Sequence, residues 1–258
     1  MTIKEKVNAV MPLCGAHANL SDPTVSEILG GMGYDYLFLD LEHTPLSAEQ
    51  AHLHLLASRA AGTPMFVRLP ADDLTVTKKV LEMGPDGVIF PMVRDYEHAC
   101  QLMANTLYPP YGIRGCGPKG AVRYGMDNEP YYYGEGHLKM CRFAMIELKS
   151  AALDAERIAS IPYLDGCLLG MQDLSGSIER LGDIFCEENV ELAMKAIKAF
   201  QKAGKTVAVS TYATDEATLR RYRDMGINMI TTGADYVYMV KGGMETLKTI
   251  RGLQGTEK

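Results

Sequence analysis

The sequence predicts a (β/α)8 TIM barrel, a closed ring of eight parallel strands in which each strand is followed by a helix. Three observations favour this fold class. A chain of 258 residues has the usual length of one such barrel. Short, continuously apolar runs alternate with longer segments of helical period along the whole sequence. Residues 85–92 (PDGVIFPM) and 164–171 (LDGCLLGM) look like the same strand entry used twice, as expected of a repeated unit.

Eight segments have the composition of strands. They are mainly apolar without alternation, which is typical of parallel strands covered on both faces. The segments are 10–15, 36–40, 65–69, 87–91, 143–147, 166–170, 206–210 and 229–232. An open, doubly wound sheet is the alternative architecture, because periodicity does not reveal whether a sheet closes.

The segments between the strands carry helix signals. Asp22 followed by Pro23 is typical of the start of a helix over 24–31. Ser47 is a candidate cap for a helix over 48–61 that ends before Gly62. We also expect helices at 95–107, 150–161, 187–203 and 214–225. No composition break suggests a linker, so one barrel domain is predicted for residues 1–258.

One long segment interrupts the alternation. Residues 108–139 are rich in Pro, Gly and Tyr, with YPPYG at 108–112 and PYYYGEG at 130–136. Loops of this length inside a compact domain are usually functional or take part in interfaces. The sequence therefore predicts a lid or an interface segment here.

Composition and charge exclude several function classes. The chain is 47% hydrophobic and 22% charged, which is typical of a folded core, and its net charge of −6 argues against nucleic-acid or anionic-membrane partners. Its six cysteines form no CxxC motif, which excludes a zinc knuckle and a thioredoxin-type site. No signal-peptide core or membrane-length apolar run is found. We expect a soluble, cytoplasmic protein.

Polar residues stand where several predicted strands end. The active site of a barrel is built at the carboxyl ends of its strands, so these residues are expected to meet at one mouth although they are far apart in sequence. They are Asp40, Glu42 and His43, Arg68, Glu147, Asp173, and Ser210 with Thr211.

Glu147 and Asp173 form a candidate metal pair. They follow adjacent predicted strands, and two carboxylates that leave room for water and substrate oxygens suit Mg²⁺ or Mn²⁺. The alternative is that each acid merely caps the helix that follows it.

His43 is the candidate for proton transfer, because Asp40 or a neighbour can orient its ring; a structural histidine is the alternative. The remaining histidines are not predicted to lie in the mouth, and they are His17, His52, His54, His98 and His137.

Arg68 lies on an otherwise apolar strand and therefore requires an anionic partner. That partner is either a substrate carboxylate, which suits the planar guanidinium, or a structural ion pair with Asp40 or Glu42.

Two rival uses of the mouth have weaker support. Residues 230–235 (ITTGAD) look like a phosphate-binding loop, but Asp235 would stand beside the anion. A Schiff-base mechanism needs a lysine in the mouth. No lysine ends a predicted strand, since Lys149 begins a helix and Lys205 precedes a strand.

The ordered motifs DLEH (40–43), VR (67–68), YPPYGIRG (108–115), IE (146–147) and GMQDLS (170–175) resemble those of the HpcH/HpaI aldolase and citrate lyase family of metal-dependent 2-keto acid aldolases. The resemblance implies a barrel of the phosphoenolpyruvate/pyruvate-binding type. It also implies homo-oligomers in which the last helix is exchanged between subunits, giving hexamers built as trimers of dimers.

The same resemblance assigns roles to residues. Glu147 and Asp173 would hold Mg²⁺ or Mn²⁺, with Co²⁺ as a further candidate. Arg68 would contact the keto acid, and His43 and Asp40 would handle proton transfer. Gly170, Gln172 and Asp173 belong to the turn that binds the substrate.

The chain departs from the family pattern at several places, one of which is the Tyr-rich stretch 131–133. The turn reads GMQD at 170–173 where the family commonly has GPxD, Glu147 is followed by Leu-Lys, and VSTY at 209–212 replaces a small, apolar run. We interpret these departures as a shifted aldehyde or acyl partner, with the metal pair retained.

The expected activity is that of a class II aldolase. A divalent cation would act as Lewis acid while a C–C bond between a pyruvate-like enolate and an aldehyde is formed or broken, and His43 would take the proton of the C4 hydroxyl. A CoA-thioester lyase of the citrate lyase beta type and a catalytically repurposed relative stay open as alternatives.

Overall fold

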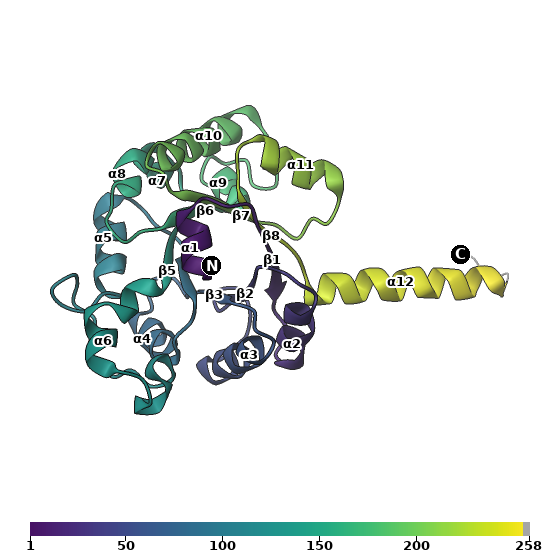
Figure 1. Cartoon of the computed structure of the whole chain (residues 1–258). Coiled ribbons are helices and arrows are strands. Elements are labelled where there is room, and N and C mark those ends of the chain that lie inside the picture. Colours follow the sequence, from purple (N-terminus) through teal and green to yellow (C-terminus); the bar gives the residue numbers. More distant parts are fainter. Residues whose placement is uncertain (255–258) are drawn as a thin grey trace.

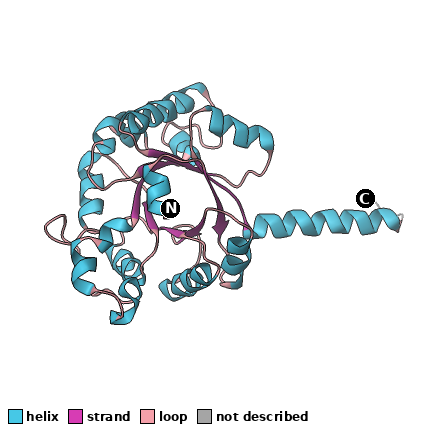
Figure 2. Cartoon of the chain, in the orientation of Figure 1, coloured by secondary structure: helices cyan, strands magenta, loops and turns pink. Residues whose placement is uncertain are grey.

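A closed barrel of eight parallel strands forms the centre of the protein, whose computed structural model describes residues 1–254 (Figures 1 and 2). The strands follow one another around the ring in chain order, and β8 pairs with β1 to close it. The predicted TIM barrel is confirmed, and the open sheet is excluded. The single domain predicted for 1–258 remains a prediction, and its last four residues lie outside the described part.

The strands agree with the sequence prediction within a few residues. They are β1 Leu13–Ala18, β2 Tyr36–Asp40, β3 Met65–Arg68, β4 Gly87–Phe90, β5 Cys141–Ile146, β6 Gly166–Leu169, β7 Thr206–Ser210 and β8 Met229–Ala234.

The largest error is at β1, which was predicted at 10–15 and begins three residues later. The amides of Val10 and Met11 bond back to carbonyls of the first helix. Pro12 has no amide to give to a neighbouring strand.

The helices surround the barrel. They are α1 Ile3–Asn8, α2 Thr24–Gly31, α3 Ala48–Ala60, α4 Leu74–Met83, α5 Tyr96–Ala104, α6 Glu129–Gly134, α7 Lys149–Leu153, α8 Ala155–Ala159, α9 Met171–Gly176, α10 Glu187–Lys202, α11 Glu216–Asp224 and α12 Asp235–Leu253.

Several helical regions differ from the sequence prediction, which had no helix at α1, α4 or α6. The segment predicted as one helix over 150–161 is divided at Asp154 into α7 and α8. Helix α4 was missed, because its first turn contains the β-branched residues Thr75, Val76 and Thr77, which have low helix propensity. The side chain of Asp73 caps α4 by accepting a hydrogen bond from the amide of Val76.

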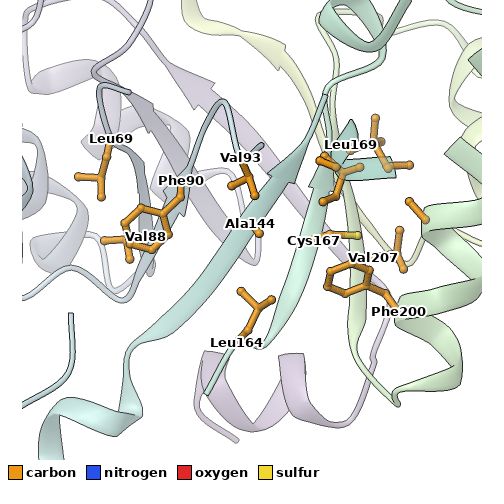
Figure 3. Packing of buried hydrophobic residues seen from close by; sticks show 14 of the residues in the cluster. Leu69, Val88, Phe90, Val93, Ala144, Leu164, Cys167, Leu169, Phe200 and Val207 are labelled. Atoms are coloured by element: carbon orange, nitrogen blue, oxygen red, sulfur yellow. The ribbon is translucent and has the colours of Figure 1, made fainter. Parts of the chain in front are cut away.

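Apolar side chains pack on both sides of the strands. Inside the barrel, the rings of Tyr36, Phe66 and Phe143 meet edge to face, and Ile3 and Val7 of α1 close the amino-terminal end. Outside, a larger cluster fills the space between strands and helices; Phe200 of α10, for example, packs near Val207 of β7 (Figure 3). Burial on both faces explains why the strands are continuously apolar.

The Tyr-rich segment 108–139 is folded against the barrel and is not an open loop. It contains α6 and the 3-10 helices η1 Gly120–Gly125 and η2 Gly136–Lys139. The guanidinium of Arg114 lies over the Tyr108 ring, 4.5 Å from its centroid, and close to Tyr132. Arg142 of β5 donates to the backbone carbonyl of His137. The expected lid is therefore a packed side wall, and an interface role for it remains a prediction.

Helix α12 projects away from the barrel (Figure 1). Five of its exposed apolar side chains fall on one face by helical spacing. We call this face the α12 stripe, and it consists of Met239, Val240, Met244, Leu247 and Ile250. Within residues 1–254, α12 included, no helix combines the length and the apolar character needed to cross a membrane.

The barrel wall has a matching uncovered groove. It has a volume of about 820 Å³ and lies beside α11, along β8 and the start of β1. Its apolar lining comes from Leu13, Leu219, Ile227 and Ile230. We call it the β8–β1 groove.

The packing inside the barrel generates a stability prediction. A Cβ built on Gly87 would lie 2.3–2.9 Å from atoms of the Phe66 ring, which is itself held by Tyr36 and Phe143. We expect Gly87→Ala to lower the free energy of unfolding by about 1–3 kcal/mol, measured by urea denaturation.

Gly31 is the matched control, because it is exposed on α2 and a Cβ there would meet nothing within 4 Å. Gly31→Ala should leave stability equal to or up to about 1 kcal/mol above that of the parent protein. Equal midpoints for the two variants would mean that the barrel interior is looser than described.

Candidate active site

The predicted site residues gather at the carboxyl ends of the strands, at the end of the barrel opposite α1. Asp40 ends β2 and Arg68 ends β3, where the two residues pair in register. Glu147 follows β5, and Asp173 lies in the first turn of α9, which follows β6. The sequence placed these residues at one mouth, and their electrostatic coupling agrees with that.

Asp40 and Arg68 form a buried two-point ion pair. Nε of Arg68 donates to Oδ1 of Asp40 at 2.9 Å, and Nη2 donates to Oδ2 at 2.5 Å. Burial by itself raises the pKa of Asp40, but Arg68 outweighs it and holds the pKa below its usual range. The structural ion pair considered for Arg68 is therefore present, and Nη1 of Arg68 remains directed toward Glu42, 3.4 Å away.

The loop after β2 presents His43 to solvent. Oδ1 of Asp40 accepts the backbone amides of Glu42 and His43. The His43 ring is 63% exposed, and its Nε2 lies 3.8 Å from a carboxylate oxygen of Glu42. Asp40 thus orients the backbone of His43 and does not touch its ring. The group beside the ring was expected to be Asp40 or a neighbour, and it is the neighbour, Glu42.

Glu147 is a buried carboxyl group at the base of the mouth. Its Oε1 accepts the amide of Met92 at 2.5 Å, and Met92 has a left-handed backbone with φ 52°. Burial, helped by the nearby charges of Glu42 and Asp173, raises the pKa of Glu147 to about 7, against the lowering effects of Met92 and Arg68. A strained non-glycine residue that supports a perturbed carboxyl is typical of a functional site.

Gly170 makes room for the Glu147 carboxylate. A Cβ on Gly170 would lie 2.6 Å from both Cβ and Oε2 of Glu147. The exposed residues Gln172 and Asp173 follow in the first turn of α9. Glycine at position 170 thus lets the end of β6 lie close to Glu147, where any larger side chain would collide with it.

The carboxylates fit a divalent cation. Besides burial, the charges of Glu42 and Asp173 raise the pKa of Glu147, and the charge of Asp173 also raises that of Glu42. Like charges thus converge here, with Arg68 as the nearby cation. Oε2 of Glu147 and the exposed Asp173 carboxylate supply hard oxygen donors. Across residues 1–254, no three His, Cys, Asp or Glu side chains form a complete ligand set, so water and substrate oxygens would complete the coordination.

His17 is a mouth residue that the sequence interpretation missed. It lies near the end of β1, with its ring against Phe38 and close to Arg68 and Asp40. Its Nδ1 lies 2.5 Å from the carbonyl of Gly233 and its Nε2 lies 2.7 Å from Oγ of Ser210. The strand had been predicted at 10–15, which left His17 two residues beyond its end. Alternate residues of a strand lie on the same face, so Leu13, Gly15 and His17 share one face of β1. This spacing could have identified His17 from the sequence.

The rival uses of the mouth lose support. The Asp235 carboxylate accepts the amides of Asn19 and Leu20 and so takes the place that a phosphate would need. The lysines considered for a Schiff base are engaged elsewhere. Lys149 pairs with Glu188, and Nζ of Lys205 donates to the carbonyl of Ile161.

Comparison with known proteins agrees with this geometry. The family model described as HpcH/HpaI aldolase/citrate lyase matches residues 14–241. A hydroxypyruvate/pyruvate aldolase of Roseovarius nubinhibens is 31% identical over 91% of this chain and 91% of that protein. A 4-hydroxy-2-oxovalerate aldolase of Novosphingobium aromaticivorans is 32% identical over 90% of this chain and 87% of that protein.

A solved structure shows the same architecture over nearly the whole chain. The crystal structure of an HpcH/HpaI aldolase/citrate lyase family protein from Burkholderia cenocepacia has a TM-score of 0.89 and 28% identity, and the match covers 96% of this chain and 98% of that one. The family generally depends on a divalent metal, which agrees with the donor set described above. The chain belongs to the HpcH/HpaI aldolase/citrate lyase family and is a carbon–carbon lyase.

Proposed function

We propose that this protein is a metal-dependent aldolase that forms or cleaves the C–C bond between a pyruvate-like keto acid and an aldehyde. The observation that carries the proposal is the buried Glu147 carboxyl, which lies within electrostatic reach of Asp173, Glu42 and Arg68. Relatives named as pyruvate, hydroxypyruvate and 4-hydroxy-2-oxovalerate aldolases support the substrate class.

We assign the metal to Glu147 and Asp173. When bound there, Mg²⁺, Mn²⁺ or Co²⁺ supplies Lewis acidity for the negative charge that develops on the keto acid oxygen. Met92 and Gly170 contribute by holding Glu147: the first donates its amide to Oε1, and the second leaves space beside Oε2. We assign the backbone of Gly170 and Gln172, beside Asp173, to the turn that binds the substrate.

Arg68 is the assigned contact for the keto acid carboxylate. Two of its nitrogen atoms are held by Asp40, which fixes the plane of the guanidinium, while Nη1 faces Glu42 at 3.4 Å and Sδ of Met145 at 3.9 Å. A fixed guanidinium loses less entropy on binding an anion than a free one does. Asp40 is accordingly a positioning residue.

His43 is the assigned base. Its exposed ring can accept the C4 hydroxyl proton at Nε2 during cleavage and return it during condensation, directly or through a water molecule. A carboxylate oxygen of the adjacent Glu42 lies 3.8 Å from this Nε2. The soluble, cytoplasmic character expected from the sequence is compatible with this small-molecule chemistry and remains a prediction.

Removal of one carboxylate tests the metal assignment. In Glu147→Gln the carboxylate becomes a neutral amide of nearly the same shape, so Mn²⁺ affinity should fall at least about tenfold by electron paramagnetic resonance. Exchange of pyruvate methyl protons with deuterated water, which reports enolate formation, should fall by about 100-fold or more.

The control is Glu191→Gln, which makes the same change on the exposed face of α10 and should leave both readings at the parent values. Inactivation by borohydride with pyruvate, combined with full activity in the presence of a chelator, would refute the metal assignment in favour of a Schiff base.

We also propose that subunits exchange α12. Within residues 1–254 nothing covers the α12 stripe, and the apolar β8–β1 groove lies open on the same barrel. A second copy can place its stripe in this groove, while its own groove receives the first helix. The hexameric trimer of dimers is the larger assembly expected from the family resemblance.

Charge placed on the stripe should disrupt this assembly. We expect the parent protein to be an oligomer by light scattering coupled to size-exclusion chromatography, and Val240→Glu with Met244→Glu to dissociate it. Thr249→Glu is the control on the opposite face of α12 and should not change the mass. A monomeric parent protein would contradict helix exchange.

A further inference from the structure

A second group of polar side chains lines the mouth across from the carboxylates. It comes from β1 and β7 and from the residues that follow these strands. In the eight-stranded ring β1 stands four strands from β5 and β7 stands two, so the group extends from the side opposite Glu147 toward β6. We call it the acceptor wall, and it consists of His17, Asn19, Ser210 and Tyr212.

The hydrogen bonds of His17 fix its tautomer. The Gly233 carbonyl can only accept, so the His17 nitrogen facing it, Nδ1, must carry the proton. Nε2 is then an acceptor, and the hydroxyl of Ser210 donates to it at 2.7 Å. The proton of Ser210 is thereby committed, and the lone pairs of its Oγ are left to accept from another group.

His17 is held in this neutral state. Burial lowers its pKa to about 4, with Arg68 acting in the same direction. A histidine of this kind is too weak a base to activate Ser210 as a nucleophile at neutral pH. The pair therefore presents a hydrogen-bond acceptor of fixed direction and not a covalent catalyst.

The acceptor wall begins next to the residue assigned to the keto acid. The rings of His17 and Phe38 are 4.9 Å apart, and the guanidinium carbon of Arg68 lies 5.7 Å from the same Phe38 ring. Ser210 is half-buried, so its side chain is not sealed inside the barrel.

The rest of the wall contributes further acceptors, together with the Tyr212 hydroxyl, which can also donate. The Tyr212 ring packs on His17 from the solvent side, and Nδ2 of Asn19 approaches its hydroxyl at 3.4 Å. Oδ1 of Asn19 is buried and finds no hydrogen-bond partner within residues 1–254. The carboxylate of Asp235 lies behind, fixed by the Asn19 and Leu20 amides. Such a surface favours a hydroxyl donor and disfavours an anion.

We propose that the acceptor wall binds the aldehyde partner and selects an aldehyde whose carbon next to the carbonyl carries a hydroxyl group. The inference rests on the proposed aldolase function and names the class of its second substrate. The substrate hydroxyl donates to Oγ of Ser210. An apolar aldehyde leaves this oxygen without a partner, and a carboxylate brings a second negative charge toward Asp235.

Three aldehydes of similar size test the selection. With pyruvate as the common donor, kcat/KM is measured for glycolaldehyde, which carries the hydroxyl, for acetaldehyde, which lacks it, and for glyoxylate, which carries a carboxylate. We expect glycolaldehyde to exceed acetaldehyde by about tenfold, the value of one well-formed hydrogen bond, and to exceed glyoxylate as well.

Two variants connect the preference to the wall. In Ser210→Ala the glycolaldehyde-to-acetaldehyde ratio should fall to near one, and His17→Phe, which keeps a flat ring but releases the Ser210 hydroxyl, should also lower it. The ratio within each variant cancels losses from folding or metal binding. Ser160→Ala, an exposed serine far from the mouth, is the control and should keep the parent ratio.

The outcomes separate this inference from the proposed function. If the parent protein exchanges pyruvate methyl protons with solvent but shows no preference for glycolaldehyde, the acceptor-wall assignment is overturned and the aldolase proposal stands. Retention of the preference in Ser210→Ala has the same meaning. Absence of the exchange in the parent protein overturns both.

Discussion

The pairing of β8 with β1 is the constraint on which the rest of the structure depends. It closes the ring, so residues that are far apart in sequence end at one mouth. Closure also covers every strand on both faces, with aromatic rings inside and helices outside. The mouth is the one end of this packed barrel that loops can shape for chemistry, since α1 fills the other end.

The two sides of the mouth differ in charge. The side with Arg68 and Glu147 carries charged groups, and the side with His17 and Ser210 carries neutral ones. Asp40 neutralises and orients Arg68, while burial and the charges of Glu42 and Asp173 disfavour the ionised form of Glu147. A divalent cation would reverse that preference, which links metal binding to the charge state of Glu147. On the opposite side, His17 is neutral and holds Ser210 in a fixed orientation. The two sides match the two proposed substrates, an anionic keto acid and a neutral aldehyde.

Much of this arrangement could be predicted from the sequence, because continuously apolar strands mark their own ends. The predicted segments 65–69, 143–147 and 166–170 end within one residue of the ends of β3, β5 and β6, so Arg68, Glu147 and Asp173 could be assigned to one mouth by counting to the ends of strands. The predictions that failed depend on contacts between residues far apart in sequence, which the pattern of apolar residues does not reveal. His17 was missed because β1 begins after Pro12, and the bonds of Asp40 to Arg68 are set by register between neighbouring strands. The hydrophobic periodicity of the sequence likewise does not show that α12 points away from the barrel.

The most direct test of the account is the position of the metal. A crystal of the protein soaked with Mn²⁺ and pyruvate should show an anomalous scattering peak between the side-chain oxygens of Glu147 and Asp173, with the pyruvate carboxylate near Arg68. A peak at any other place, or Glu147 and Asp173 turned away from each other around an empty mouth, would contradict it.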